Sequence, residues 1–206
     1  LELQDGARWV WRSELLRPIM FTSIAWNIAW FMLQATYVPY AIHDLGLDAG
    51  GVGVTLAAYG VGMIVGALLA PRVVALLPFG QAILLGPYFS VLAALTMAMT
   101  LVWPQGWLAG LSYFLFGAGP IIWTITSTTL RQTVTPRAMI GRVTSINIVV
   151  STGARPLGAA LGGLVGANAP VSVSLWCVVM GFCLQAIVIS ASRVRTLQRL
   201  PDPLPD

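Results

Sequence analysis

Long apolar stretches separated by short polar breaks make up most of the sequence. A helix needs roughly 20 apolar residues to cross the ~30 Å hydrocarbon core of a bilayer, because each residue advances it by about 1.5 Å. Pro, Gly and charged residues divide the chain into six such stretches. We predict membrane-spanning helices at residues 18–42, 52–77, 79–102, 107–130, 143–167 and 171–192. The expected fold is therefore an all-α membrane protein, a single six-transmembrane-helix bundle over residues 18–192.

The two ends of the chain differ in composition from the apolar stretches. Residues 1–17 mix charged and apolar side chains, a pattern that suits either an amphipathic helix on the cytoplasmic membrane surface or an ordinary solvated linker. Residues 193–206 are predicted to be a short cytoplasmic tail. The chain begins at Leu1 without a methionine and shows no signal-peptide pattern, so we expect it to be a fragment of a longer protein.

The arginines predict the orientation of the bundle. The sequence has eleven positive side chains, all of them arginine, and only 9% of its residues are charged. Ten of these arginines flank the spans at alternate connections and at both ends: Arg8, Arg12, Arg17, Arg72, Arg131, Arg137, Arg142, Arg193, Arg195 and Arg199. Cytoplasmic loops retain positive charge, so both termini are predicted to be cytoplasmic. Because the arginines are scattered between apolar stretches, nucleic-acid binding is not expected.

Composition argues against several classes of protein. With 57% hydrophobic residues the chain cannot present the surface of a soluble enzyme or of a secreted disulfide scaffold. Cys177 and Cys183 lie six residues apart in one span, on different helix faces, and are interpreted as packing residues. No catalytic or metal-ligand motif is present, and no predicted span contains Asp or Glu. We therefore expect no enzymatic activity, no metal and no cofactor, and any proton-coupling carboxylate should lie outside this chain.

Arg155 is the strongest candidate for a functional side chain, because it lies near the middle of the fifth predicted span. Insertion scales put the cost of a central arginine at roughly 2.5–3.5 kcal/mol, so it should face protein or water. Small and polar residues share its helix face: Thr144, Ser151, Gly158, Gly162 and Gly166. Two interpretations stay open. Arg155 binds an anionic substrate group or a carboxylate, or it hydrogen-bonds the carbonyls that Pro156 frees.

Polar or small faces also occur on three other predicted spans, 18–42, 52–77 and 107–130, whereas spans 79–102 and 171–192 have only scattered polar residues. A bundle with four helices around an aqueous pathway and two facing lipid would show this division. The predicted cavity residues are Asn27, Gln34, Tyr59, Tyr113, Thr124, Asn147 and Arg155. For a single Ser or Thr, a hydrogen bond to its own helix backbone is the plainer interpretation.

Residues 129–143, TLRQTVTPRAMIGRV, run on to GARPLG at 153–158 and to Gly162-Gly163. This segment resembles the cytoplasmic loop between helices ten and eleven, and helix eleven itself, of the major facilitator superfamily. The resemblance is to the branch that includes bacterial siderophore and macrolide exporters. Trp11-Arg12 with Leu16-Arg17-Pro18 resembles the approach to helix seven, and Gly62, Gly66 and Pro71-Arg72 resemble the C-terminal copy of the helix-two signature loop.

The resemblance implies the C-terminal six-helix half of a twelve-helix carrier, partnered by the missing N-terminal half, the lipid bilayer and a small-molecule substrate. It implies that helices seven, eight, ten and eleven face the cavity, in agreement with the polar faces above. The implied function is secondary active export of small amphipathic molecules by alternating access in the bacterial inner membrane. Arg155 would be the electrostatic anchor. The residues assigned to the cytoplasmic rim or gate are Arg72, Arg131, Arg137 and Arg142, whose other interpretation is as plain topology determinants.

The alternative function is a self-contained six-helix membrane protein, acting as a homodimeric carrier or as a non-transporting scaffold. The start at Leu1 and the linker-like residues 1–17 argue against it. An ion channel is a weaker alternative, because neither a ring of charged residues nor a carbonyl filter loop is recognisable.

Overall fold

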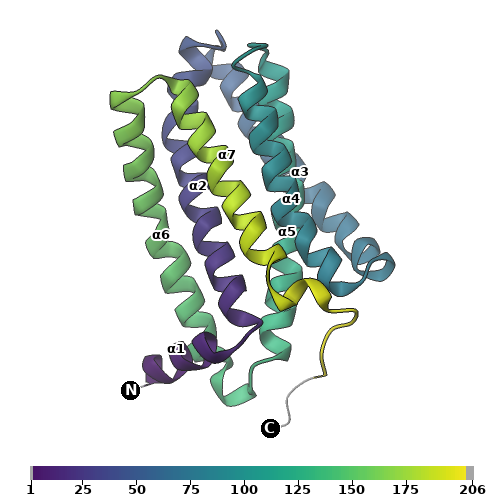
Figure 1. Cartoon of the computed structure of the whole chain (residues 1–206). Helices are drawn as coiled ribbons and strands as arrows, with labels where there is room; N and C mark the ends of the chain where they lie inside the picture. The colour runs from purple at the N-terminus through teal and green to yellow at the C-terminus, as the bar shows by residue number, and fades with distance from the viewer. Residues whose placement is uncertain (1, 203–206) are drawn as a thin grey trace.

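The computed structural model describes residues 2–202, which form seven α-helices and two short 3-10 helices without any strand (Figure 1). The α-helices are α1 (Glu2–Arg12), α2 (Leu16–His43), α3 (Ala49–Leu76), α4 (Phe79–Met99), α5 (Gly106–Thr133), α6 (Ile140–Asn168) and α7 (Val171–Ser190). The 3-10 helices are η1 (Arg137–Met139), just before α6, and η2 (Arg193–Thr196), just after α7. The expectation of an all-α fold is confirmed.

Five helices, α3 to α7, are long and apolar enough to cross a membrane, with α6 counted together with η1. The remaining long helix, α2, has 28 residues but is not among them. Asn27 and Gln34 lie in its middle and lower its hydropathy. The structure therefore supports five of the six predicted spans by length and composition.

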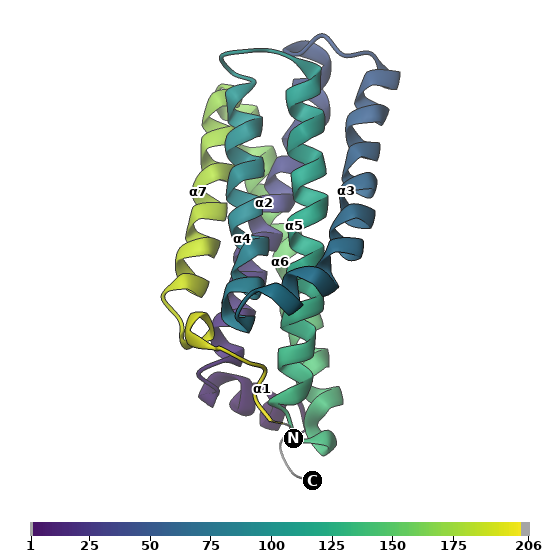
Figure 2. The same ribbon diagram turned by 90° about the vertical axis from the view of Figure 1, so that its right-hand side faces the viewer.

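The long helices run side by side, and the two ends of the described chain lie at the same end of the bundle (Figure 1). Helix α2 packs against α6 and α7, while α5 packs against α3 and α4. Helices α4 and α7 close the contact between these two groups (Figure 2). Between α2 and α5 the two groups touch mainly through aromatic side chains, which leaves space for a cavity beside them.

Glycines allow two of the helix pairs to approach closely. A Cβ atom at Gly158 or Gly162 of α6 would overlap the backbone of Ile28 or Met32 in α2. On the other side of the bundle, Gly62 of α3 lies against α5 in the same way. Glycines at four-residue spacing predict such close contacts in membrane proteins. Each cavity wall is thus a pair of helices in backbone contact.

Helix α3 changes direction near its end (Figure 2). Its last turns, which contain Pro71, leave the axis of the first part and run across toward α4. Proline removes one backbone donor and kinks a helix without having to end it. Arg72, which was predicted to lie at a turn, is therefore inside α3, and Pro78 separates α3 from α4.

Helix α1 lies across the end of the bundle, next to the start of α6 (Figure 1). Gly6 and Val10 form its buried face, and a Cβ at Gly6 would touch Ile146 and Arg142 of α6. Arg8 and Arg12 are exposed on the opposite side. Residues 2–12 are thus helical and amphipathic, packed on the bundle by a glycine contact.

Candidate functional site

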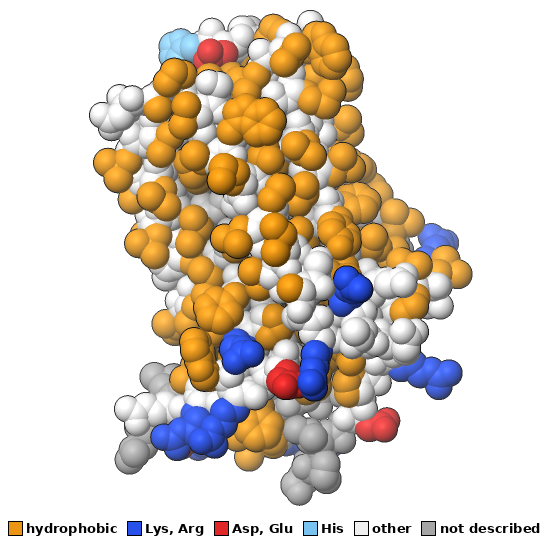
Figure 3. Space-filling model, in the orientation of Figure 1, with side chains coloured by type: hydrophobic (Ala, Val, Ile, Leu, Met, Phe, Trp, Pro, Cys, Tyr) orange, Lys and Arg blue, Asp and Glu red, His pale blue; other side chains and the backbone are white. Residues whose placement is uncertain are grey.

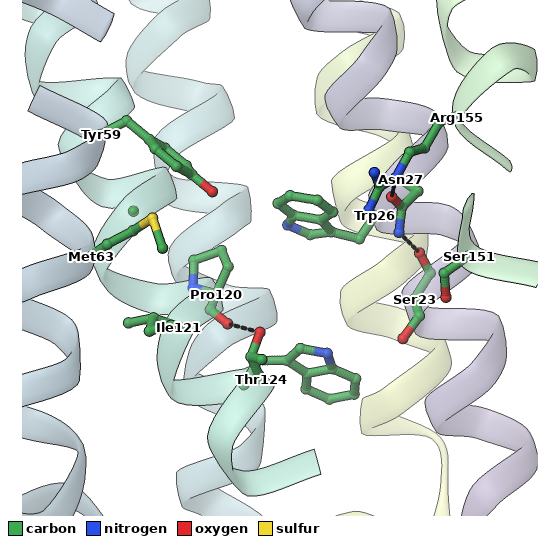
Figure 4. Close-up of a pocket in the computed structure, with 12 residues that line it drawn as sticks. Ser23, Trp26, Asn27, Tyr59, Met63, Pro120, Ile121, Thr124, Ser151 and Arg155 are labelled. Atoms are coloured by element: carbon green, nitrogen blue, oxygen red, sulfur yellow. Dashed lines mark hydrogen bonds between the residues drawn. The ribbon is translucent and has the colours of Figure 1, made fainter. Parts of the chain in front are cut away.

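A cavity of about 240 Å³ lies between the pair α2 and α6 and the pair α3 and α5 (Figure 4). Its lining residues are Ser23, Trp26, Asn27, Tyr59, Met63, Gly117, Pro120, Ile121, Trp123, Thr124, Ser151 and Arg155. Four of the seven cavity residues named from the sequence, Asn27, Tyr59, Thr124 and Arg155, are among them. These four come from four different helices, so the cavity is a product of the tertiary fold.

Arg155 reaches from α6 to α2 along one wall of the cavity (Figure 4). Its Nε donates a hydrogen bond to Asn27 Oδ1 at 3.1 Å, and its guanidinium carbon lies 5.4 Å from the centre of the Phe31 ring. Asn27 Nδ2 donates to the Ser23 carbonyl at 2.9 Å, which fixes the amide so that its oxygen faces Arg155. Within residues 2–202 this is the one hydrogen bond of Arg155, so its Nη groups remain available to a ligand.

The opposite wall carries weaker polar groups. The Tyr59 hydroxyl points into the cavity toward α2 (Figure 4). Thr124 donates its hydroxyl to the Pro120 carbonyl at 2.9 Å, so it satisfies its own helix backbone. Ser151, on the same side as Arg155, has a buried Oγ without a hydrogen-bond partner among the described residues. The cavity thus offers one cation and a few hydroxyls, with the cation on one side.

Aromatic rings make part of the apolar lining, and Trp30, which is not itself a lining residue, packs against two of them. Trp30 of α2 stacks on Trp26 at 5.4 Å and on Tyr59 of α3 at 5.2 Å between ring centres. Its edge contact with Phe116 of α5 is 5.0 Å. Trp30 is only 7% exposed, so this cluster is a fixed wall joining three helices. Trp26 and Met63 were not predicted as cavity residues, because apolar side chains in a membrane span carry no distinguishing signal.

Gln34 and Tyr113, two other predicted cavity residues, lie outside this lining and contact each other. The Tyr113 hydroxyl donates to Gln34 Oε1 at 2.8 Å and so links α5 to α2. Tyr113 is fully buried and meets the Tyr37 ring edge-on at 4.6 Å. The pair connects the two halves of the bundle beside the aromatic wall.

We expect Gln34→Ala to destabilise the protein by about 1–3 kcal/mol, because it leaves the buried Tyr113 hydroxyl without a partner. Tyr113→Phe removes the hydroxyl itself, so no buried donor is left unpaired, and it should destabilise the protein less than Gln34→Ala. A double-mutant cycle on the thermal midpoint of the detergent-solubilised protein should give a coupling above about 0.5 kcal/mol. Additive effects of the two substitutions would contradict the hydrogen bond.

Asn147, the remaining predicted cavity residue, lies in a different and much smaller pocket under α1. It lines this pocket with Arg131 and apolar residues that include Val10 and Leu16. Arg131 Nη2 donates to Thr128 Oγ1 at 3.4 Å, while its buried Nε has no hydrogen-bond partner among the described residues. The structure therefore separates Asn147 from Arg155 and groups it with Arg131, which was predicted to lie at the cytoplasmic rim.

The other rim residues lie at or near the end of the bundle that holds both chain ends. Arg137 is in η1, Arg142 is in the first turn of α6, and Arg72 is in the bent end of α3. Arg72 and Arg137 are exposed, and Arg142 is half-buried. In residues 2–202 no group of three His, Cys, Asp or Glu side chains is placed to hold a metal ion.

Comparison with known proteins gives a family match and a fold match. Residues 2–202 match the model of a family described as transmembrane secretion effector. Crystal structures of a mutant peptide transporter POT, alone and in complex with alafosfalin, share the fold with a TM-score of 0.68 at 20% identity. The match covers 92% of this chain and 41% of the transporter chain, so this chain spans less than half of that protein. A comparison with curated proteins found no match.

Proposed function

We propose that this chain, which belongs to the transmembrane secretion effector family of the major facilitator superfamily, is the C-terminal six-helix half of an exporter of small amphipathic molecules. The family and the shared fold indicate a multi-pass membrane transporter rather than an enzyme. Export and the class of substrate are our proposal. The observation that carries it is the cavity in which Arg155 faces an aromatic wall.

The lining of the cavity favours a substrate with one polar end and an apolar body. The guanidinium of Arg155 is a planar donor that stays charged, so it suits a carboxylate, a phosphate or a carbonyl group. Trp26 and Met63 would contact the apolar body, and Tyr59 supplies a second hydrogen-bonding group. Most small-molecule sites combine a largely apolar lining with few polar groups in this way.

We infer that α2 is the sixth membrane span. Its 28 residues give a length of about 42 Å, which exceeds the ~30 Å of the hydrocarbon core. It runs beside α6 and α7 through the bundle (Figure 1). Its polar residues Asn27 and Gln34 are both partnered across helices, by Arg155 and Tyr113. A span whose side-chain amides hydrogen-bond to other helices of the protein is compatible with the bilayer.

We propose that the end of the bundle with both chain ends faces the cytoplasm of a bacterium and that the bundle lies in its inner membrane. Arginines gather at this end in the space-filling view, together with acidic side chains, whereas the other end shows the histidine and an acidic residue but no arginine in this view (Figure 3). The connections on the opposite side contain neither lysine nor arginine, and this difference in positive charge supports the orientation. Helix α1 would then lie on the cytoplasmic surface.

The exposed faces of α3 and α6 support a missing partner half. Among the 18 most apolar consecutive residues of each helix, 22% are buried in α3 and 17% in α6. The same fraction is 61% in α4 and 56% in α5. These two helices flank the cavity, so we propose that an N-terminal half covers them and completes the site. Rocking of the two halves around a midplane site is the alternating-access mechanism of this fold.

An efflux assay tests the proposed function. Cells expressing the complete native reading frame should accumulate less of at least one compound in a panel of dyes, macrolides and siderophores than cells with an empty vector. A protonophore together with a sodium ionophore should abolish the difference, because a secondary transporter draws on an ion gradient. Equal accumulation despite expression in the membrane, or efflux that survives both ionophores, would contradict the proposal. Six further apolar spans upstream would distinguish a half-carrier from the self-contained alternative.

A further inference from the structure

A groove of about 320 Å³ lies on the outside of the bundle, between the start of α2 and the end of α7. It shares no residue with the cavity around Arg155. Its polar lining includes Glu14, Arg17 and Arg193, and its apolar lining includes Pro18, Phe21 and Val188. The groove therefore has a charged part and an apolar part, which is the division found in a phospholipid.

The charged part is dominated by arginine. Arg193 forms an ion pair with Glu14 at 2.6 Å, with exposed fractions of 75% and 59%. Such an exposed pair contributes little to stability, so an incoming anion can compete with Glu14 for the guanidinium. Arg17 is a second exposed guanidinium on the groove, which leaves one positive charge in excess. Figure 3 shows further arginine side chains over the same end of the molecule.

The apolar part continues along α7. Phe21 and Val188 line the groove, and α7 exposes Met180, Leu184 and Ile187 at a spacing that puts them on one helix face. The stripe leads from the groove toward the opposite end of the bundle. Trp11 is 58% exposed and meets the Phe21 ring edge-on at 5.9 Å. Exposed tryptophans favour the level of the lipid headgroups, which places the mouth of the groove at that level.

We propose that this groove binds an anionic phospholipid, with the headgroup phosphate between Arg17 and Arg193 and an acyl chain along the exposed stripe of α7. Arginine pairs with phosphate through two parallel hydrogen bonds, and basic pockets on the cytoplasmic side of membrane proteins recognise anionic headgroups in this way. Glu14 competes with the phosphate for Arg193 and so limits the affinity. This site depends on the bundle lying in a bilayer and not on the substrate that the cavity takes.

Spin-labelled lipids test the proposal on the complete native protein in phosphatidylcholine vesicles. The wild type should bind labelled phosphatidylglycerol in preference to labelled phosphatidylcholine. The double variant Arg17→Gln/Arg193→Gln should reduce this preference by about tenfold or more, because each of the two arginines near an anionic surface contributes roughly fivefold. The matched control Arg195→Gln/Arg199→Gln removes the same charge from the adjacent tail, outside the groove lining, and should retain most of the preference.

Two results with the wild type and the double variants would overturn the site. An equal loss in both double variants would mean a diffuse attraction to the basic end of the protein, and no preference in the wild type would mean no anionic lipid site. Glu14→Gln tests the site without removing an arginine. It should raise the preference for phosphatidylglycerol by about twofold or more, since it removes the competing carboxylate. An unchanged preference in this variant would contradict the groove even if the double variant does not fold.

Discussion

Replacing Arg155 with alanine is expected to lower the initial rate of efflux by about tenfold or more at equal expression. Charged hydrogen bonds contribute about 1.5–3 kcal/mol each, and the substitution removes every donor that Arg155 offers to a substrate. It also leaves the Asn27 Oδ1 acceptor without its donor. The measurement is the efflux rate of whichever compound the panel identifies, in cells with matched amounts of protein in the membrane.

Arg155→Lys and Asn27→Ala test whether efflux needs only a positive charge at position 155 or also the guanidinium in its observed position. Lysine keeps the positive charge but not the planar fork, so its rate should lie between those of the wild type and the alanine variant. Asn27→Ala keeps Arg155 but removes its hydrogen-bond partner, and we expect a smaller loss than in Arg155→Ala. Arg199→Gln, in the exposed tail, is the charge-matched control and should leave efflux unchanged. A normal rate in Arg155→Ala would mean that this arginine has only a structural role.

The helices follow from the sequence because apolar length and proline breaks act locally. The predicted start at residue 79 coincides with the first residue of α4, since Pro78 cannot continue α3 and is well placed just before a helix. Helix α2 shows where hydropathy alone fails to identify a membrane span. Asn27 and Gln34 make it a candidate cavity helix, and they also lower the apolar signal that would mark it as a span.

The sequence predicts which face of a helix carries the polar residues of the candidate site, but not the level along the bundle axis at which each residue finds its partner. Asn147 precedes Arg155 by eight residues, which is about 12 Å along a helix axis. A helical wheel projects the two residues about 80° apart, on the same half of the helix, whereas the structure places Asn147 near α1 with Arg131. Gln34 follows Asn27 by seven residues, almost on the same face, and meets Tyr113 instead of the cavity. The partner of each polar residue depends on tertiary packing, which a single sequence does not encode locally.

Close helix contacts also determine where the cavity can be. Gly62 and Gly117 bring α3 and α5 into backbone contact, so Tyr59 on α3 is held at a fixed distance from the rings of α2. Gly158 and Gly162 do the same for α6 and α2, and thereby hold Arg155 beside Asn27. The small residues and the polar residues thus have separate roles. The glycines determine the distance between the helices of each wall, and the polar side chains determine which groups a ligand in the cavity can bind.

Gly62→Ala is expected to lower the thermal midpoint of the purified complete protein by about 6–12 °C. Overpacking costs about 1–3 kcal/mol, and 1 kcal/mol corresponds to roughly 2–4 °C for a domain of this size. The upper end of this range applies because the new methyl group would overlap the Phe114 carbonyl and lie 3.1 Å from the Ala118 nitrogen. Backbone atoms in a packed helix cannot rotate away, so α3 and α5 must separate.

Gly60→Ala is the matched control, because it makes the same change two residues earlier on α3, where a Cβ meets nothing within 4 Å. Alanine favours a helix by about 1 kcal/mol over glycine, so this variant should keep or raise the midpoint. Gly117→Ala places a methyl group on the Tyr59 carbonyl from the other side and should match Gly62→Ala. If all three variants melt together, α3 and α5 do not form the close pair that positions Tyr59, and the wall of the cavity would have to be drawn differently.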